Sequence, residues 1–216
     1  MATVLTLEPL DFNVLGNTLR LQLRGKPCAG QRVVQVDYPA SFAAKSIDKG
    51  VAALDQMLHR VTGPKLVFAH SQGAQVCSRW LRKYTNTAGA PSPQEVSFLL
   101  IGNPLRKYGG YIIGRPEVGG QVGLPTLNDT PYSVTDIKMQ YDGWADVPDK
   151  PGKWALLNAS TGRNGRHCYG YLGADMDDPF RWVYKEGTTT YVMLPGKPNI
   201  PVPQSWIESS YFRPER

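Results

Sequence analysis

The hydrophobic positions of this 216-residue chain change period along the sequence, and the changes predict strands that alternate with helices. Residues 66–68 form a continuous apolar run, which is typical of a central parallel strand covered on both faces. A spacing of three and four residues predicts a helix before this run, with Ile47, Val51, Leu54, Leu58 and Val61 on one face. The same spacing predicts a helix that starts near Gln72, with Ala74, Cys77, Leu81 and Tyr84 on one face.

The remaining segments follow other patterns. Residues 3–9 and 134–141 predict strands, and residues 182–193 predict a hairpin that turns at Glu186–Gly187. The proline-rich residues 195–203 are excluded from a central strand, and they pack along the domain or contact a partner. The fold class is therefore α/β, with a mostly parallel central sheet and helices on both faces.

A long insert, residues 108–132, is rich in Gly and Pro and has few periodic signals. It forms either an ordered surface loop or a lid or acyl-binding wall built with Tyr111, Ile112 and Ile113. We expect one domain over residues 1–216, which contains this insert and ends in the hairpin and proline-rich tail of residues 180–216.

The most informative motif is the small-x-Ser-x-Gly turn that follows the apolar run, with Ala69, Ser71 and Gly73 at its key positions. Small residues on both sides of a serine allow the tight strand-to-helix turn of a nucleophile elbow. Ala69 replaces the glycine of the strict pattern and adds only a methyl group. Ser71 is the candidate nucleophile, and the alternative is that Ser71 merely caps the helix.

A serine nucleophile needs a histidine base and a carboxylate that orients this base. Of the three histidines, His59 lies at the end of the first predicted helix, and His70 is expected to point away from the nucleophile's proton. His167 remains, in a Gly-rich loop at residues 163–170. The candidate acid is Asp142, directly after the strand predicted at residues 134–141, and Asp146 competes with it.

The wider pattern resembles the cutinase-like branch of the α/β hydrolases, and more specifically the PE-PPE serine hydrolase domain of mycobacteria, which is close to the phage lysin B esterases. The resemblance covers roughly residues 30 to 200, and its specific parts are Gly102-Asn103-Pro104 and residues 141–146, Tyr-Asp-Gly-Trp-Ala-Asp. It implies an α/β-hydrolase fold and a triad carried onto Ser71, Asp142 and His167. It also implies esterase or lipase activity on acyl chains without a metal or other cofactor.

Two departures from the cutinase pattern affect the expected site. Ala145 stands where cutinases commonly carry a cysteine beside the catalytic acid, so that disulfide is missing. The first strand lacks the Gly-Thr-Gly type of turn that often supplies an oxyanion donor. The backbone N–H of Gln72 is expected to supply one donor, and a second is expected from Thr6 to Asp11.

Composition narrows the remaining possibilities. The net charge of +6 comes from scattered Lys and Arg, which does not predict specific nucleic-acid binding. Cys28, Cys77 and Cys168 are expected to be free thiols, and no metal-ligand spacing occurs. No apolar run approaches the roughly 18 residues of a membrane span, and the N-terminus lacks a secretory signal pattern. We expect synthesis in the cytoplasm, followed by assembly into a phage virion or release to the cell envelope.

The sequence thus predicts a serine carboxylic-ester hydrolase that acts through an acyl-enzyme on an acyl-ester lipid, such as a mycolyl-type cell-envelope glycolipid. The alternative is a structural or binding protein, for example a phage virion component, that keeps the hydrolase fold with little turnover.

Overall fold

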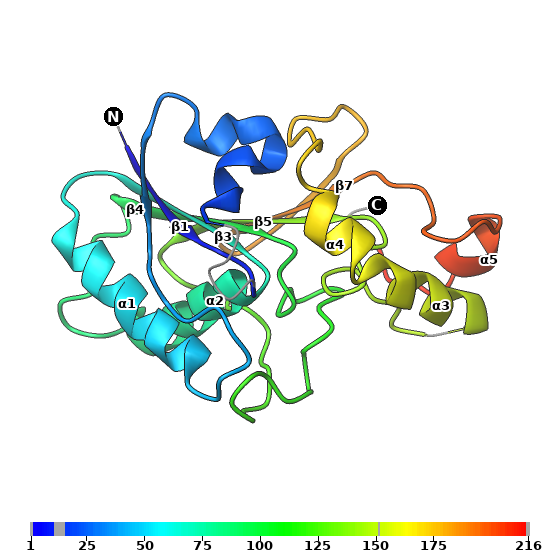
Figure 1. Cartoon of the computed structure of the whole chain (residues 1–216), viewed down its shortest axis with the longest axis horizontal. Coiled ribbons are helices and arrows are strands. Elements are labelled where there is room, and N and C mark those ends of the chain that lie inside the picture. The colour runs from blue at the N-terminus through cyan, green and yellow to red at the C-terminus, as the bar shows by residue number, and fades with distance from the viewer. Residues whose placement is uncertain (1, 11–15, 151, 215–216) are drawn as a thin grey trace.

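A seven-stranded sheet forms the centre of the protein (Figure 1). The computed structural model describes residues 2–10, 16–150 and 152–214. The strands are β1 (Thr3–Leu7), β2 (Arg32–Gln35), β3 (Lys65–His70), β4 (Val96–Ile101), β5 (Ser133–Met139), β6 (Trp182–Glu186) and β7 (Thr189–Leu194). Their spatial order is β2-β1-β3-β4-β5-β7-β6, and only β6 runs antiparallel to its neighbour. The mostly parallel sheet that the sequence predicts is confirmed.

The central strands are apolar throughout because both of their faces are covered. Successive residues of β3 point to opposite sides, so that Val67 and Ala69 join one apolar cluster and Phe68 joins the other. The first cluster lies under two long helices, α1 (Ser46–Arg60) and α2 (Gln72–Tyr84). These two helices confirm the two periodic segments, including the start of the second helix at Gln72.

The opposite face of the sheet is covered by shorter pieces. A 3₁₀ segment, η1 (Thr18–Cys28), packs Leu19 and Leu23 against this face, and Tyr171 belongs to the same apolar cluster. The N–H of Leu23 donates a hydrogen bond of 2.7 Å to the carbonyl of Tyr171. The α/β arrangement that the sequence predicts is present, but this face carries two short 3₁₀ pieces, joined by a kink at residues 22–25, and the loop around Tyr171 instead of long helices.

The second half of the chain supplies strands β5, β6 and β7 and three short helices, α3 (Lys153–Gly162), α4 (Gly165–Tyr169) and α5 (Ser205–Glu208). The predicted hairpin is confirmed, with Glu186 and Thr189 paired beside the turn and Gly187 at a φ of 57°. The proline-rich segment packs along the domain: Asn199 binds Asn158 through its backbone N–H and the Tyr141 carbonyl through its side chain.

The insert at residues 108–132 is anchored at its base by a buried polar network. Arg106 and Asp136 form an ion pair of 3.0 Å, and both side chains are fully buried. The Asn103 amide donates to Asp136 at 2.8 Å and to Thr126 at 2.9 Å. This network explains the Gly-Asn-Pro-Leu-Arg motif, because its polar side chains join the end of β4 to β5 and to the insert.

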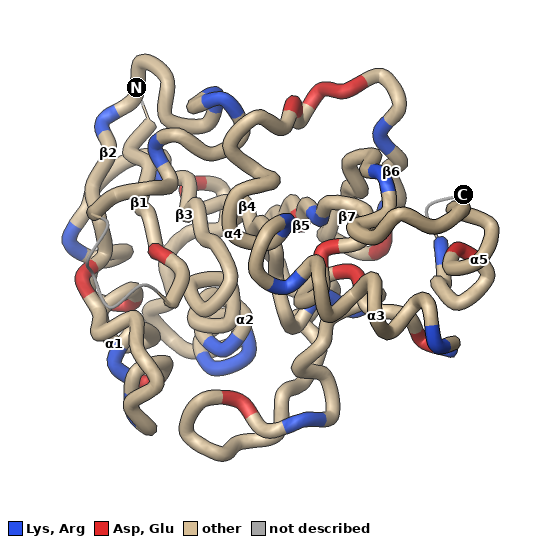
Figure 2. The backbone as a smooth tube through the Cα atoms, turned by 45° about the vertical axis from the view of Figure 1, so that its right-hand side comes forward, with Lys and Arg blue, Asp and Glu red and all other residues tan. Residues whose placement is uncertain are grey.

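Charged residues are spread over the elements, and Figure 2 shows Lys and Arg interspersed with Asp and Glu along the chain. Cys28, Cys77 and Cys168 are free thiols, as expected. Within the described ranges, no helix is both long and apolar enough to cross a membrane.

Candidate active site

Ser71 occupies a strained turn between β3 and α2. Its φ of 54° and ψ of −113° lie in a region that non-glycine residues rarely adopt. The turn is held on one side by the Ser71 N–H, which donates to the Ile101 carbonyl at 3.2 Å. On the other side, a Cβ atom at Gly73 would lie 2.3 Å from the Leu7 carbonyl oxygen. The Ser71 side chain makes no capping hydrogen bond to α2, which argues against the capping interpretation.

The Ser71 hydroxyl contacts the imidazole of His167, whose Nε2 lies 2.8 Å from Oγ. His167 is 5% exposed and lies on α4. The prediction of a Gly-rich loop at residues 163–170 was therefore wrong in its secondary structure. Four consecutive helix-compatible residues follow Gly165, and the α4 turn places His167 inward while Cys168 and Tyr169 stay exposed.

Asp142 lies on the far side of the His167 ring. The Nδ1 atom of His167 is 2.9 Å and 3.0 Å from the two carboxylate oxygens of Asp142, which is fully buried. The carboxylate also accepts hydrogen bonds from the backbone N–H groups of Trp144 at 2.9 Å and Ala145 at 3.3 Å. Burial by itself would raise the pKa of Asp142, but the His167 ring and these donors outweigh burial, so the pKa is lowered and the carboxylate stays ionised.

Asp146, the competing acid, faces away from the histidine into an ion cluster. Its carboxylate lies 3.1 Å from Lys138 Nζ and 2.7 Å from Arg213 Nη1, and it accepts the Tyr141 N–H at 2.6 Å. Burial opposes ionisation, but Lys138 and Arg213 outweigh it and lower the pKa of Asp146. The structure thus brings Ser71, His167 and Asp142 together, and Asp146 ties β5 to the C-terminal segment instead.

Tyr171 also supports this arrangement, and sequence reasoning did not identify it. Its hydroxyl donates to Asp142 at 2.7 Å and accepts the Met139 N–H at 3.1 Å. Burial and the nearby Asp142 charge raise the pKa of Tyr171 well above its ordinary value, so the hydroxyl keeps its proton. Tyr171 lies two residues beyond the end of α4, so no periodic pattern in the sequence points to it.

His70 does not form a hydrogen bond with Ser71, in line with the expectation, but it packs directly behind the site. Its ring centroid lies 4.9 Å from that of His167, and the side chain is almost completely buried. Neither ring nitrogen finds a hydrogen-bond partner of normal geometry among the described residues. Burial and the neighbouring His167 lower the pKa of His70 to about 3, so the ring is neutral at neutral pH. A Cβ atom at Gly102 would lie 3.0 Å from both imidazoles, which leaves room only for glycine there.

The backbone N–H of Gln72 is the first of α2 and has no carbonyl one turn earlier in the helix, so it is free to bind an oxyanion. The Gln72 side chain points elsewhere: its amide donates to the Ser41 carbonyl at 3.0 Å and accepts from Ser46 at 3.1 Å. The second donor stays a prediction. Within the range Thr6 to Asp11, Leu10 lines the site pocket, whereas Asp11 lies outside the described residues.

Ser71 and His167 open into a pocket of about 310 Å³ with largely apolar walls. The walls come from segments that are distant in sequence: Leu10, Phe42, Gln75, Pro104, Ile112, Pro116, Val118, Trp144, Arg163, Asn164 and Cys168. Ile112, Pro116 and Val118 belong to the insert, so part of this segment lines the pocket, and of the three residues expected in such a wall only Ile112 does. Tyr111 stands behind the wall against Trp144, and Ile113 pairs with Gly123.

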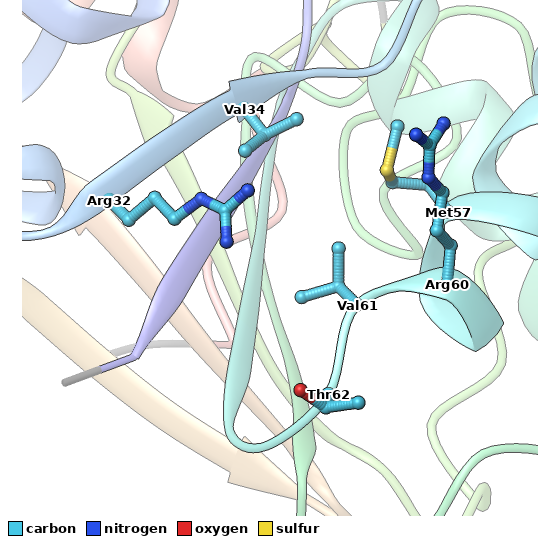
Figure 3. A pocket seen from close by; sticks show the side chains of 6 residues that line it. All are labelled: Arg32, Val34, Met57, Arg60, Val61 and Thr62. Carbon is cyan, nitrogen blue, oxygen red and sulfur yellow. The ribbon is translucent and has the colours of Figure 1, made fainter.

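A separate hollow of about 290 Å³ lies between β2 and the end of α1, lined by Arg32, Val34, Met57, Arg60, Val61 and Thr62 (Figure 3). It is near the start of β2, whereas Ser71 and Asp142 follow the carboxyl ends of β3 and β5. In the part of the chain that the structure describes, no group of three or more His, Cys, Asp or Glu side chains could hold a metal ion.

Two solved structures align with part of this chain. A cutinase-like protein from Cryptococcus sp. is 16% identical, with 68% of this chain and 79% of that chain covered and a TM-score of 0.47. Lysin B from mycobacteriophage D29 is 17% identical, with 75% and 72% covered and a TM-score of 0.43. The family assignment rests on the sequence.

Three relatives from Mycobacterium tuberculosis match most of the chain. Esterase PE16 is 35% identical, over 61% of this chain and 27% of its own length. SL1278 acyltransferase Chp1 is 29% identical, over 76% and 42%, and diacyltrehalose acyltransferase Chp2 is 26% identical, over 73% and 48%. The matches thus span between a quarter and a half of these relatives. Residues 29–204 match the PE-PPE domain, so the chain belongs to the PE-PPE domain family.

Proposed function

We propose that this chain is an acyl-transfer enzyme of the serine esterase type, with Ser71 as nucleophile, His167 as general base and Asp142 as the orienting acid. The observation that supports the proposal is the continuous hydrogen-bonded line from Ser71 Oγ to His167 Nε2 and from Nδ1 to Asp142, at 2.8 Å and 2.9 Å. This line lies at the wall of a largely apolar pocket that can receive an acyl chain.

In the first half-reaction, Ser71 Oγ attacks the ester carbonyl carbon while its proton passes to His167 Nε2. The developing oxyanion accepts a hydrogen bond from the Gln72 N–H, at the positive end of the α2 dipole. His167 then returns the proton to the leaving alcohol, and the acyl group remains on Ser71. Asp142 stabilises the imidazolium and keeps the proton on Nδ1, so that Nε2 accepts the serine proton.

The second half-reaction repeats these steps with an incoming hydroxyl. When water attacks the acyl carbon, one of its protons goes to His167, which then delivers that proton to Ser71 Oγ as the acyl–serine bond breaks and a carboxylic acid leaves. When an alcohol enters, the acyl group is transferred to that alcohol. Transfer is a second candidate function, favoured by the two acyltransferase relatives, which match about three quarters of this chain. We place the substrate among acyl-ester lipids, such as those of the cell envelope.

Fluorophosphonate labelling with mass spectrometry tests the nucleophile. The wild-type protein should be labelled stoichiometrically at Ser71, and Ser71→Ala should fold normally and remain unlabelled. Short and long acyl esters of p-nitrophenol then measure turnover with Ser71→Ala as the blank, and added glycerol or trehalose separates transfer from hydrolysis. A wild-type protein that is neither labelled nor faster than the blank would support the structural or binding alternative.

A further inference from the structure

Among the residues that the structure describes, Arg163 is the only Lys, Arg, Asp or Glu whose side chain lines the pocket of Ser71 and His167. It follows the last residue of α3 and lies four residues before His167. Apart from His167, the other lining residues that the structure describes are either apolar or polar without a charge. A single cation therefore stands beside the reacting group, in a pocket otherwise suited to an acyl chain.

The guanidinium of Arg163 has no protein counter-ion within the described residues. Its Nε donates to the Gly143 carbonyl at 3.4 Å, and its remaining contacts are aromatic. The guanidinium carbon lies 4.1 Å from the centre of the Tyr111 ring and 5.4 Å from the centre of the Trp144 ring. Arg79, Arg106 and Arg213 each pair with a carboxylate instead, whereas Arg166, also partly buried, binds the Asn199 side chain and the Lys197 carbonyl. Neither terminal nitrogen of Arg163 makes a hydrogen bond to a described residue, so both can bind a ligand.

Close backbone packing fixes the Arg163 stem in place. A Cβ atom at Gly143 would lie 2.7 Å from Arg163 Cγ and 2.0 Å from the Ala159 carbonyl oxygen, and one at Gly162 would lie 2.3 Å from the Tyr141 carbonyl oxygen. These two glycines let the end of α3 press against the loop that carries Asp142. A side chain held in advance loses little conformational entropy when it binds a ligand. The negative end of the α3 dipole also favours a cation at this position.

We propose that Arg163 forms a binding subsite for an anionic oxygen group, namely a carboxylate, sulfate or phosphate, that the substrate carries near its reacting ester. The planar guanidinium presents donors in a fork that matches such groups. The inference rests on the proposed function, because it assigns a substrate class to the same site. The competing explanation is structural: Arg163 would serve only to hold Tyr111 and Trp144 in place.

Arg115 provides a matched control for that explanation. Its guanidinium carbon lies 4.6 Å from the centre of the same Tyr111 ring, and its Nη1 donates to the Tyr111 carbonyl at 2.6 Å. Arg115 is exposed and is absent from the pocket wall. Arg115→Gln therefore removes a stacked arginine and leaves the proposed subsite intact.

The kinetic test compares p-nitrophenyl valerate with mono-p-nitrophenyl glutarate, two esters with five-carbon acyl chains of which only the second carries a carboxylate. Arg163→Gln should lower kcat/KM for the glutarate by about 10- to 100-fold, mainly through KM, as expected for loss of one charge-assisted hydrogen-bonded contact. Valerate turnover should change by less than about threefold. Arg163→Lys should recover part of the glutarate activity, and Arg115→Gln should leave both substrates unaffected. Valeryl esters of 4-hydroxybenzoate and 4-hydroxybenzamide repeat the comparison with the charge on the alcohol.

Equal losses for charged and neutral esters, or no loss for either, would overturn the subsite. A binding measurement separates this failure from failure of the proposed function. Calorimetric titration with 4-hydroxybenzoate should show binding to wild-type protein that is lost in Arg163→Gln, with 4-hydroxybenzamide as the neutral comparison. Serine-dependent esterase activity without this anion binding would contradict the subsite alone. Anion binding without esterase activity would contradict the proposed function alone.

Discussion

At the scale of single residues, two carboxylates that lie only four positions apart in the sequence have different surroundings. Asp142 and Asp146 are both fully buried, and the pKa of each is lowered by its partners. The partners differ in kind, because Asp142 faces an imidazole that can gain a proton, while Asp146 faces the permanent cations Lys138 and Arg213. The first arrangement supports proton transfer, and the second holds the fold together.

Substitution by asparagine should therefore affect the two positions in different ways. Asp142→Asn should lower turnover of p-nitrophenyl butyrate by about three to four orders of magnitude, because the imidazole loses its orienting acceptor. Asp146→Asn should lower the free energy of unfolding, because it removes the buried negative charge that Lys138 and Arg213 share, and should affect turnover far less. Urea unfolding and kinetics measured on the same samples separate the two effects. The reverse ranking in turnover would assign the orienting role to Asp146.

The buried His70 leads to a prediction about how the free energy of unfolding depends on pH. Burial lowers its pKa to about 3, whereas an unfolded histidine titrates near 6.5. Between these values the unfolded chain binds more protons, so the free energy of unfolding should fall as pH falls, by up to about 1.4 kcal/mol per pH unit. Urea unfolding between pH 7 and 4.5 should therefore give a shallower pH slope for His70→Asn than for the wild type.

His59 is the control for this measurement, because its pKa shifts in the other direction. Its ring is bound by the carbonyls of Asp55 and Gly89, which raise the pKa of His59. A raised pKa contributes stability at low pH that is lost as pH rises, so His59→Asn should not flatten the acid slope. Parallel slopes for His70→Asn and the wild type would mean that His70 is protonated in the folded protein.

The residues that the sequence identified differ in kind from those it missed. Ser71, Asp142 and His167 were found because each has a local signal: a turn motif, the end of a strand, or elimination among three histidines. Tyr171, His70 and Arg163 have no such signal, since their roles depend on contacts that only the folded chain creates. Arg163 gains its importance from Tyr111 and Trp144, which are distant from it in sequence.

At the scale of elements, the elbow depends on the close approach of β1 and α2. Gly73 lies against the Leu7 carbonyl, and an alanine methyl there would sit 2.3 Å from that oxygen and 2.8 Å from its carbon. The end of β1 would have to move, together with the residues after it that include Leu10 of the pocket wall. The contact between Gly73 and the Leu7 carbonyl therefore positions both the turn at Ser71 and the pocket wall at Leu10.

Gly73→Ala should reduce stability by about 1–3 kcal/mol, as overpacking does elsewhere, and should reduce esterase activity. Gly165→Ala is the matched control, because no heavy atom lies within 4 Å of a Cβ atom at Gly165. This second substitution lies at the start of α4 beside His167 and should leave stability and activity almost unchanged. Urea unfolding of both variants measures the difference, and equal stabilities would argue against the β1–α2 contact.

The elements that the sequence predicted well are those with long periodic patterns. α1, α2, the central strands and the β6–β7 hairpin have apolar spacings that are set by burial against the sheet. The short elements were missed: η1 contains residues with left-handed φ values, among them Leu23 and Arg24, and α4 has only five residues. Their conformation is imposed by tertiary contacts, such as the backbone hydrogen bond between Leu23 and Tyr171.

At the scale of the whole molecule, the pocket is assembled from segments that are far apart in the sequence. Leu10 follows β1, Phe42 precedes α1, Ile112 belongs to the insert and Trp144 follows β5. The insert is attached through Thr126, which accepts a hydrogen bond from the Asn103 amide, and the same amide donates to Asp136, so this wall is held by the network that joins β4 to β5. Substrate preference should therefore respond to changes in the insert that leave Ser71 untouched.

A series of p-nitrophenyl esters with two to eight acyl carbons tests this preference. Each methylene that the pocket covers should raise kcat/KM about fourfold, which corresponds to about 0.8 kcal/mol of burial, until the pocket of about 310 Å³ is filled. Ile112→Trp should fill this space and flatten the series, while acetate turnover stays within about threefold of wild type. Leu124→Trp adds the same bulk at a half-exposed position of the insert outside this pocket, and should leave the series unchanged. A flat series in the wild-type protein, or the same steep series in Ile112→Trp, would mean that the acyl chain binds elsewhere.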